Sequence, residues 1–246
     1  MVIEKKLKRN IIVTGSAILC AFTSIIAYQA YQEFSIYWDI PLTPQEINLY
    51  KNTAKAVVIY PFFTQVAYSN NGFYSYYKKM CGIQCLTVKF NSFDIFPTYN
   101  SGKTSYDKLL QLNYPIITDM YVDQHPDILS QYDKIIVLHA EYETKTVFHA
   151  LTSHKNIIYL YPNTFYGMIS TNYTNHTITL LKGHGYQING SGFNWKYDNT
   201  HPAEFDLSCK NWKFINIPNG TQLSCFPNFL ILHDRNLLKF IKEYPN

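Results

Sequence analysis

The chain has 246 residues, of which 47% are hydrophobic and 15% are charged, so it can bury a sizeable core and is not of the disordered class. Its formal net charge of +4 comes in part from the basic segment KKLKR at residues 5–9. Because the rest of the chain is close to neutral, the composition excludes a basic surface for nucleic acid.

An uncharged and largely apolar segment follows these basic residues. No charged side chain occurs from Asn10 to Gln32, and about 20 apolar residues of helix cross a hydrocarbon core of about 30 Å. A cleaved secretory signal is the alternative, but its apolar region is typically about 7–15 residues and ends at a small-residue cleavage site. The basic flank predicts a cytoplasmic N-terminus. We therefore expect a single-pass anchor in the cell membrane, with the remainder of the chain extracytoplasmic.

A β-α alternation begins after a polar and aromatic neck, in which Pro44 predicts the start of a short helix. Short apolar, β-branched runs are typical of buried strands. These runs are residues 56–60, 86–90, 115–118, 134–138 and 156–161. The helix-compatible segments are residues 74–80, 105–112, 126–131 and 144–153. This alternation predicts an α/β fold, with all five runs in one mainly parallel sheet that helices cover on both faces.

The pattern changes after Tyr166 to short stretches of alternating polarity, which predict antiparallel strands. These stretches are residues 177–181 and 214–217. Asn219-Gly220 predicts a hairpin turn after the second stretch, and residues 236–244 are typical of a closing amphipathic helix. The expected parts of the chain are the anchor (1–31), the neck (32–52), the α/β domain (53–169) and a β-rich C-terminal extension (170–246).

Four of the five cysteines follow the expected membrane span, and an even number in an oxidising compartment favours disulfides. The pairs we expect are Cys81 with Cys85 and Cys209 with Cys225, although three connectivities are possible. A four-cysteine zinc site is the alternative, but the spacings C-x3-C and C-x15-C depart from the usual paired C-x2-C. Four N-x-S/T sequons predict surface glycosylation. They begin at Asn172, Asn175, Asn189 and Asn219.

Polar and aromatic side chains come directly after two neighbouring apolar runs. His139, Glu141 and Tyr142 follow the fourth run, and Asn163 and Tyr166 follow the fifth. Ligands bind outside the carboxyl ends of strands in open α/β sheets, and residues two apart on an extended segment face the same side. The sequence therefore predicts a site there, with Glu141 and His139 as catalytic residues and the other three lining its cleft.

Three segments, in this order, resemble one protein family. Residues 67–77 (AYSNNGFYSYY) are similar to its motif A-Y-N-x-x-G-G-x-S-x-Y, residues 138–142 (LHAEY) to G-H-x-E-Y, and residues 163–166 (NTFY) to N-x-x-Y. The family is the C-terminal domain of the large (beta) subunit of N,N-dimethylformamidase, whose fold resembles class I glutamine amidotransferases. The resemblance covers about residues 57–169 and implies a flavodoxin-like sheet and hydrolysis of an amide C–N bond.

The resemblance also implies a ferric site held by two tyrosinates and one glutamate. Tyr68 and Glu141 match two of these ligands, and Tyr99 is the residue we assign to the second tyrosinate. Hard anionic oxygens suit a hard cation, and bound iron can polarise an amide carbonyl and activate water. The substrate would be a small amide. A cysteine-dependent glutaminase is excluded, because no cysteine stands at the nucleophile position of that family.

Departures from the family motifs favour a second hypothesis. Phe73 stands where the first motif has its second glycine, and Leu138 where the second motif has its glycine. A domain that keeps the fold without catalysis would use its aromatic cleft to bind a surface glycan or a protein partner. Metal content distinguishes this binding module from a metal-dependent hydrolase.

Overall fold

The structure, a computed structural model, describes residues 41–91, 102–183, 185–186, 192–198 and 202–245. The expected anchor, residues 32–40 of the neck, Tyr99 and Asn189 lie outside these residues. Within the described ranges, no helix combines the length and the apolar character that a membrane span requires. Membrane anchorage therefore stays a prediction from the N-terminal sequence.

A six-stranded sheet, sheet A, forms the centre of the α/β unit and has the strand order β3-β1-β4-β6-β10-β9. Its strands are β1 (Ala56–Tyr60), β3 (Ile116–Thr118), β4 (Lys134–Val137), β6 (Ile157–Tyr159), β9 (Phe214–Ile217) and β10 (Gly220–Leu223). The first five strands of this order pair in parallel, and β9 pairs antiparallel at one edge. The predicted mainly parallel sheet is confirmed.

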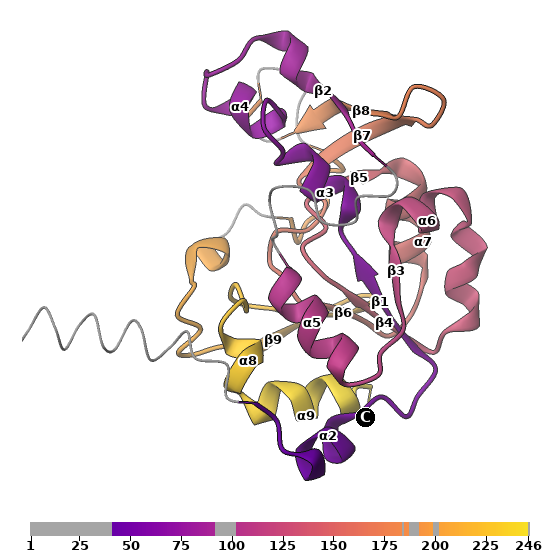
Figure 1. Cartoon of the computed structure of the whole chain (residues 1–246), viewed down its shortest axis with the longest axis vertical. Helices are drawn as coiled ribbons and strands as arrows, with labels where there is room; N and C mark the ends of the chain where they lie inside the picture. The colour runs from indigo at the N-terminus through magenta and orange to yellow at the C-terminus, as the bar shows by residue number, and fades with distance from the viewer. Residues whose placement is uncertain (1–40, 92–101, 184, 187–191, 199–201, 246) are drawn as a thin grey trace, which may run out of the picture. The chain divides into compact units, whose positions relative to one another are not determined.

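Helices cover both faces of sheet A (Figure 1). Val57 and Ile59 of β1 pack in one core cluster with side chains of α6 and α7, whereas Val58 and Tyr60 pack in a second cluster with α5, α8 and α9. Successive side chains of a strand point to opposite faces. Because both faces are covered, every residue of β1, β4 and β6 is buried, which explains why these strands are continuous apolar runs.

The predicted helices form with small shifts at their ends. The α-helices are α2 (Pro44–Tyr50), α3 (Phe62–Ala67), α4 (Phe73–Tyr77), α5 (Lys103–Gln111), α6 (Asp119–Gln124), α7 (Lys145–Ser153), α8 (Leu230–His233) and α9 (Arg235–Glu243). Three short 3-10 helices are η1 (Ile83–Leu86), η2 (Pro126–Gln131) and η3 (Pro202–Phe205). The segment at residues 126–131 is thus a 3-10 helix, and the segment from residue 74 ends at Tyr77, three residues earlier than expected.

The second apolar run does not join the parallel sheet, so our prediction for it was wrong. Its strand β2 (Thr87–Lys89) pairs antiparallel with β8 in a separate four-stranded sheet, sheet B, of order β2-β8-β7-β5. The other strands of sheet B are β5 (Tyr142–Thr144), β7 (Gly167–Asn172) and β8 (Thr177–Gly183). Only Val88 of the three β2 residues is buried, which suits a sheet with one covered face.

The predicted C-terminal hairpin is confirmed, but its two-residue turn is Pro218-Asn219, one residue earlier than predicted, because Gly220 already pairs with Ile217 as the first residue of β10. Strand β10 also pairs in parallel with β6. The hairpin therefore adds two strands to sheet A, and the C-terminal segment completes the α/β core instead of forming a sheet of its own. The closing helix α9 buries Leu237, Leu238 and Ile241.

Both predicted disulfides are present. Cys81 and Cys85 have Cα atoms 6.1 Å apart, and Cys209 and Cys225 have Cα atoms 5.4 Å apart. Pairing of all four domain cysteines leaves no thiolates for the alternative zinc site. Disulfides persist in oxidising compartments, which indicates an extracellular or secreted location for this part of the chain.

Candidate functional site

The site lies where the direction of strand addition reverses. From β1 the chain continues to β3 on one side of it and then crosses to β4 on the other side. Loops that leave two such neighbouring strands diverge, and a crevice at this switch point is where open α/β sheets bind ligands. Helix α3, after β1, carries Thr64 and ends at Tyr68, and the loop after β4 carries His139 and Glu141.

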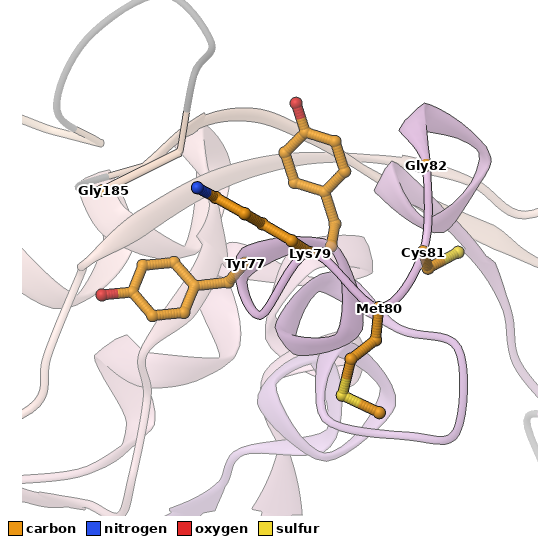
Figure 2. A pocket seen from close by; sticks show the side chains of 7 residues that line it. Tyr77, Lys79, Met80, Cys81, Gly82 and Gly185 are labelled. Atoms are coloured by element: carbon orange, nitrogen blue, oxygen red, sulfur yellow. The ribbon is translucent and has the colours of Figure 1, made fainter.

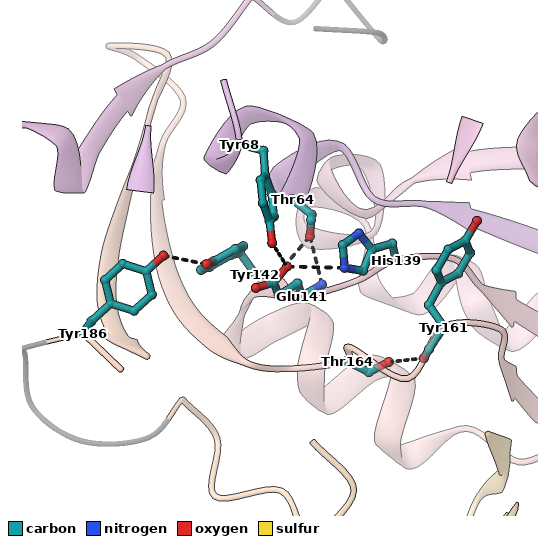
Figure 3. Close-up of polar contacts among 8 residues, drawn as sticks. All are labelled: Thr64, Tyr68, His139, Glu141, Tyr142, Tyr161, Thr164 and Tyr186. Carbon is teal, nitrogen blue, oxygen red and sulfur yellow. Dashed lines mark hydrogen bonds and ion pairs between the residues drawn. The ribbon is translucent and has the colours of Figure 1, made fainter. Parts of the chain in front are cut away.

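Tyr68 and Glu141 meet at this switch point although they are 73 positions apart in the sequence. The phenol of Tyr68 donates a hydrogen bond of 2.7 Å to Oε2 of Glu141, and Nε2 of His139 lies 3.3 Å from the same oxygen (Figure 3). The His139 ring packs against Tyr161 and Phe226, with ring centroids 5.6 and 5.3 Å away. Two polar groups thus converge on one carboxylate oxygen, and aromatic packing orients the imidazole.

Thr64 holds the loop that carries the glutamate. Its Oγ1 accepts hydrogen bonds from the backbone N–H groups of Glu141 (2.9 Å) and Tyr142 (3.1 Å). Thr64 is fully buried, so no water competes for these bonds. Sequence reasoning missed this residue, because the segment FFTQVA carries no signal that its threonine bonds to a loop 77 positions away.

Tyr142 points away from Glu141 and forms a 2.7 Å hydrogen bond with the phenol of Tyr186 (Figure 3). Burial raises the pKa of Tyr142 well above its ordinary value, and the neighbouring Glu141 carboxylate raises this pKa further. Tyr142 is therefore a neutral phenol that packs edge-on against Tyr68 at a centroid distance of 6.1 Å. Tyr166 is half-buried and contacts Tyr142 in the same manner, at 6.3 Å.

Asn163 follows β6, the parallel neighbour of β4, so it and Glu141 come after the same ends of adjacent strands. Its side chain is buried, and its Oδ1 has no hydrogen bond among the described residues. An unpaired buried amide oxygen costs free energy. This oxygen is an acceptor that a ligand could satisfy.

The sequons differ in their surroundings. Asn172 and Asn175 are exposed and suit a glycan. Asn219 is half-buried, and its Nδ2 donates to the carbonyl of Leu151 and the phenol of Tyr159, each at 3.2 Å. A glycan on Asn219 would replace one of the two Nδ2 hydrogens, so Nδ2 could not keep both hydrogen bonds.

A buried carboxyl pair lies close to the site and was not foreseen. Asp119 and Glu143 are both fully buried, and Asp119 accepts a hydrogen bond of 3.0 Å from the backbone N–H of Phe63. Burial raises the pKa of both carboxyls well above their ordinary values, and Asp119 raises the pKa of Glu143 further. Two adjacent carboxyls in a low-dielectric interior do not both ionise readily.

Replacing Glu143 with Gln is therefore expected to stabilise the protein at neutral pH. A carboxyl whose pKa is higher in the folded state contributes stability below its ordinary pKa of about 4, and this contribution is lost as pH rises through the folded value. Each unit of the shift corresponds to about 1.4 kcal/mol, and 1 kcal/mol changes the melting temperature by roughly 2–4 °C for a domain of this size.

The measurement is the melting temperature from pH 4.5 to pH 8. The curves of wild type and Glu143→Gln should nearly coincide at the acid end and separate as pH rises. Asp127 is exposed, so Asp127→Asn is the control that keeps the wild-type pH dependence. A lower melting temperature for Glu143→Gln at pH 8 would contradict the assignment.

The donor set at Glu141 fits part of the expected metal site. Tyr68 and Glu141 supply two hard oxygen donors in contact, which suit a hard cation, and the assigned third ligand, Tyr99, lies outside the described residues. Over the described part of the chain, no group of three or more His, Cys, Asp or Glu side chains is arranged to hold a metal ion. A metal held here by described residues alone would thus depend on a tyrosine ligand.

Comparison with known proteins assigns no family to this arrangement. No protein-family model matches the chain, and no curated protein matches its sequence. The function must therefore be inferred from the strand order and the geometry around Glu141.

Proposed function

We propose that this protein is a membrane-anchored, extracytoplasmic hydrolase of an amide C–N bond, related to the C-terminal domain of the N,N-dimethylformamidase large subunit. The observation that carries the proposal is the 2.7 Å contact between Tyr68 and Glu141 at the switch point of sheet A. The resemblance requires Tyr68 and Glu141 to lie close together. Nothing in the sequence near either residue requires this.

The strand order supports the same relationship. Numbered along the chain, the five parallel strands of sheet A follow the order 2-1-3-4-5, which is the flavodoxin-like order. A flavodoxin-like sheet is also the core expected of the class I glutamine amidotransferase fold. The proposed fold and the proposed site therefore rest on separate observations.

Each residue of the cluster has a distinct role in the proposed reaction. Tyr68 and Glu141 would hold the iron, which supplies Lewis-acid polarisation of the amide carbonyl and activation of water. An N–H group on Nε2 of His139 would stabilise the ionised Glu141 carboxylate from 3.3 Å. Thr64 keeps the Glu141 backbone in place. The buried surroundings strengthen these electrostatic interactions, since screening by water is weak there.

The test is metal content and the visible spectrum of the full-length protein, purified from cells that form its disulfides. We expect tightly bound iron with a tyrosinate-to-iron charge-transfer band, and hydrolysis of N,N-dimethylformamide. Glu141→Gln should abolish the metal and the activity, because an amide is a poorer ligand for a hard cation than a carboxylate. Tyr68→Phe should weaken and shift the band, because it removes one of the two assigned tyrosinate ligands.

Tyr166→Phe is the matched control, because it alters a tyrosine that contacts Tyr142 and is not among the assigned ligands. This variant should keep its iron and its colour. Colourless wild-type protein without tightly bound metal would refute the metal-dependent reaction.

A binding module without catalysis is the second candidate function. The observation that favours it is the burial of Glu141, of which only 4% is exposed, together with hollows that lie elsewhere, along α4 and η1. A partner could reach those hollows without any change at Glu141. Metal-free protein that still binds a glycan would support this function.

A further inference from the structure

A hollow on the surface of α4 and the loop after it has the features of a binding site. Its volume is about 610 Å³, and we call it the Lys79 hollow. Its lining consists of Tyr76, Tyr77, Lys79, Met80, Cys81, Gly82 and Gly185. Figure 2 shows the ammonium end of Lys79 extended on the side of the hollow where Tyr77 and Gly185 lie. A cation and aromatic rings thus share one concave surface.

The segment that supplies most of the hollow's lining carries positive charge only. Residues 67–91 contain three lysines and no aspartate or glutamate. Lys78 lies over the ring of Tyr74, 4.4 Å from its centroid, but within the described ranges no carboxylate forms an ion pair with Lys79. An unneutralised cation in a concave surface attracts anions.

The aromatic side chains present rings that are already held in place. Tyr77 is 47% exposed and stacks on Tyr74 with an interplanar angle of 8°, and Tyr76 stacks on Tyr186 at the same angle. Tyr186 in turn is hydrogen-bonded to the buried Tyr142. The Cys81–Cys85 disulfide closes the adjoining loop. A preorganised surface loses little conformational freedom when a ligand binds.

The backbone at Lys79 has a conformation that a side chain disfavours. Lys79 has a φ of 59° and follows the end of α4, and the N–H of Met80 bonds to the carbonyl of Ser75. Glycine is the usual residue at such a position, because a Cβ is unfavourable in the left-handed region. A lysine in this conformation costs stability that glycine would avoid.

We propose that the Lys79 hollow binds an acidic sugar, a uronate residue of a glycan, through a carboxylate on the Lys79 ammonium and a pyranose face on the Tyr77 ring. The C–H groups of a pyranose face carry partial positive charge and suit the negative face of an aromatic ring. An uncharged apolar ligand would cover the cation without pairing it, which is unfavourable. A simple inorganic anion would leave the rings unused.

The test is calorimetric titration of the full-length protein with a galacturonate tetrasaccharide and with its methyl ester, which keeps the rings and removes the charge. We expect the acid to bind and the ester to bind about fivefold more weakly, which is the size of an exposed charge pair. Tyr77→Ala should weaken binding of the acid by up to about tenfold, as for loss of an aromatic contact.

Lys79→Gly separates binding from folding. It should weaken binding of the acid about fivefold while the melting temperature stays equal or rises, since glycine suits the left-handed backbone. Lys78→Gln is the matched control, because it removes the same charge from a lysine that lies over Tyr74. This control should bind like the wild type. Glu141→Gln should also bind normally, so failure of the proposed hydrolase leaves this test intact.

Three outcomes would overturn the proposal: no binding of the acid by the wild type, equal binding of the acid and the ester, or equal binding by Lys79→Gly and the wild type. A membrane surface is the competing partner, because Met80 and Ile83 are 77% and 76% exposed nearby. Binding to phosphatidylserine vesicles that depends on these two side chains, without binding of the tetrasaccharide, would assign the surface to lipid.

Discussion

Thr64→Val is expected to destabilise the protein by about 2–6 kcal/mol, because each buried donor that loses its acceptor costs about 1–3 kcal/mol. Valine keeps the shape of threonine but leaves the N–H groups of Glu141 and Tyr142 without the Oγ1 that now accepts from both. The same change frees the loop that carries Glu141. We therefore expect it to lower the free energy of unfolding and, if Glu141 is a ligand of the proposed iron site, the affinity for iron as well.

Denaturant unfolding of Thr64→Val beside Thr64→Ser measures this effect. Serine retains the oxygen and loses one methyl group, so its cost should be close to 1 kcal/mol, the usual value for a buried methylene-sized group. If Thr64→Val and Thr64→Ser lower the free energy of unfolding equally, the two hydrogen bonds contribute no more to stability than the methyl group. The prediction that Thr64 holds the Glu141 loop would then be wrong.

Removing the Cys209–Cys225 disulfide as the double variant Cys209→Ala, Cys225→Ala is expected to cost about 3 kcal/mol in the chain-entropy model, because the disulfide closes a loop of about 16 residues. Both cysteines are buried in the core cluster that contains α8 and α9. Lost packing therefore adds to the cost.

The control is the double variant Cys81→Ala, Cys85→Ala, which opens a loop with a sequence separation of only 4. The same model predicts that this loop contributes roughly 1 kcal/mol less. Unfolding midpoints of the two variants give the comparison. A larger loss for the short loop would show that loop closure does not dominate the contribution of either disulfide.

The central strands and several chain reversals could be predicted from the sequence alone, because their signals are local. Strands β1, β4 and β6 are buried on both faces, so their sequences are continuous apolar runs. Helix α7 begins after Thr144, whose hydroxyl accepts a hydrogen bond from the N–H of Val147. The Asn219-Gly220 signal predicted the hairpin to within one residue of its turn, Pro218-Asn219. Cysteine number and compartment predicted that disulfides form, and the expected pairing, one of three possible connectivities, is the one that the structure contains.

The tertiary structure alone decided which distant segments meet. The run that contains β2 resembles the other apolar runs, yet it pairs with β8, and β10 takes a place beside β6. Strand pairing depends on packing against partners far away in the chain, which local propensity does not encode. For the same reason, no sequence pattern revealed that Thr64 holds the Glu141 loop or that Asp119 and Glu143 are buried together. These side chains acquire their roles only when the loops after β1, β3 and β4 are brought to one end of the sheet.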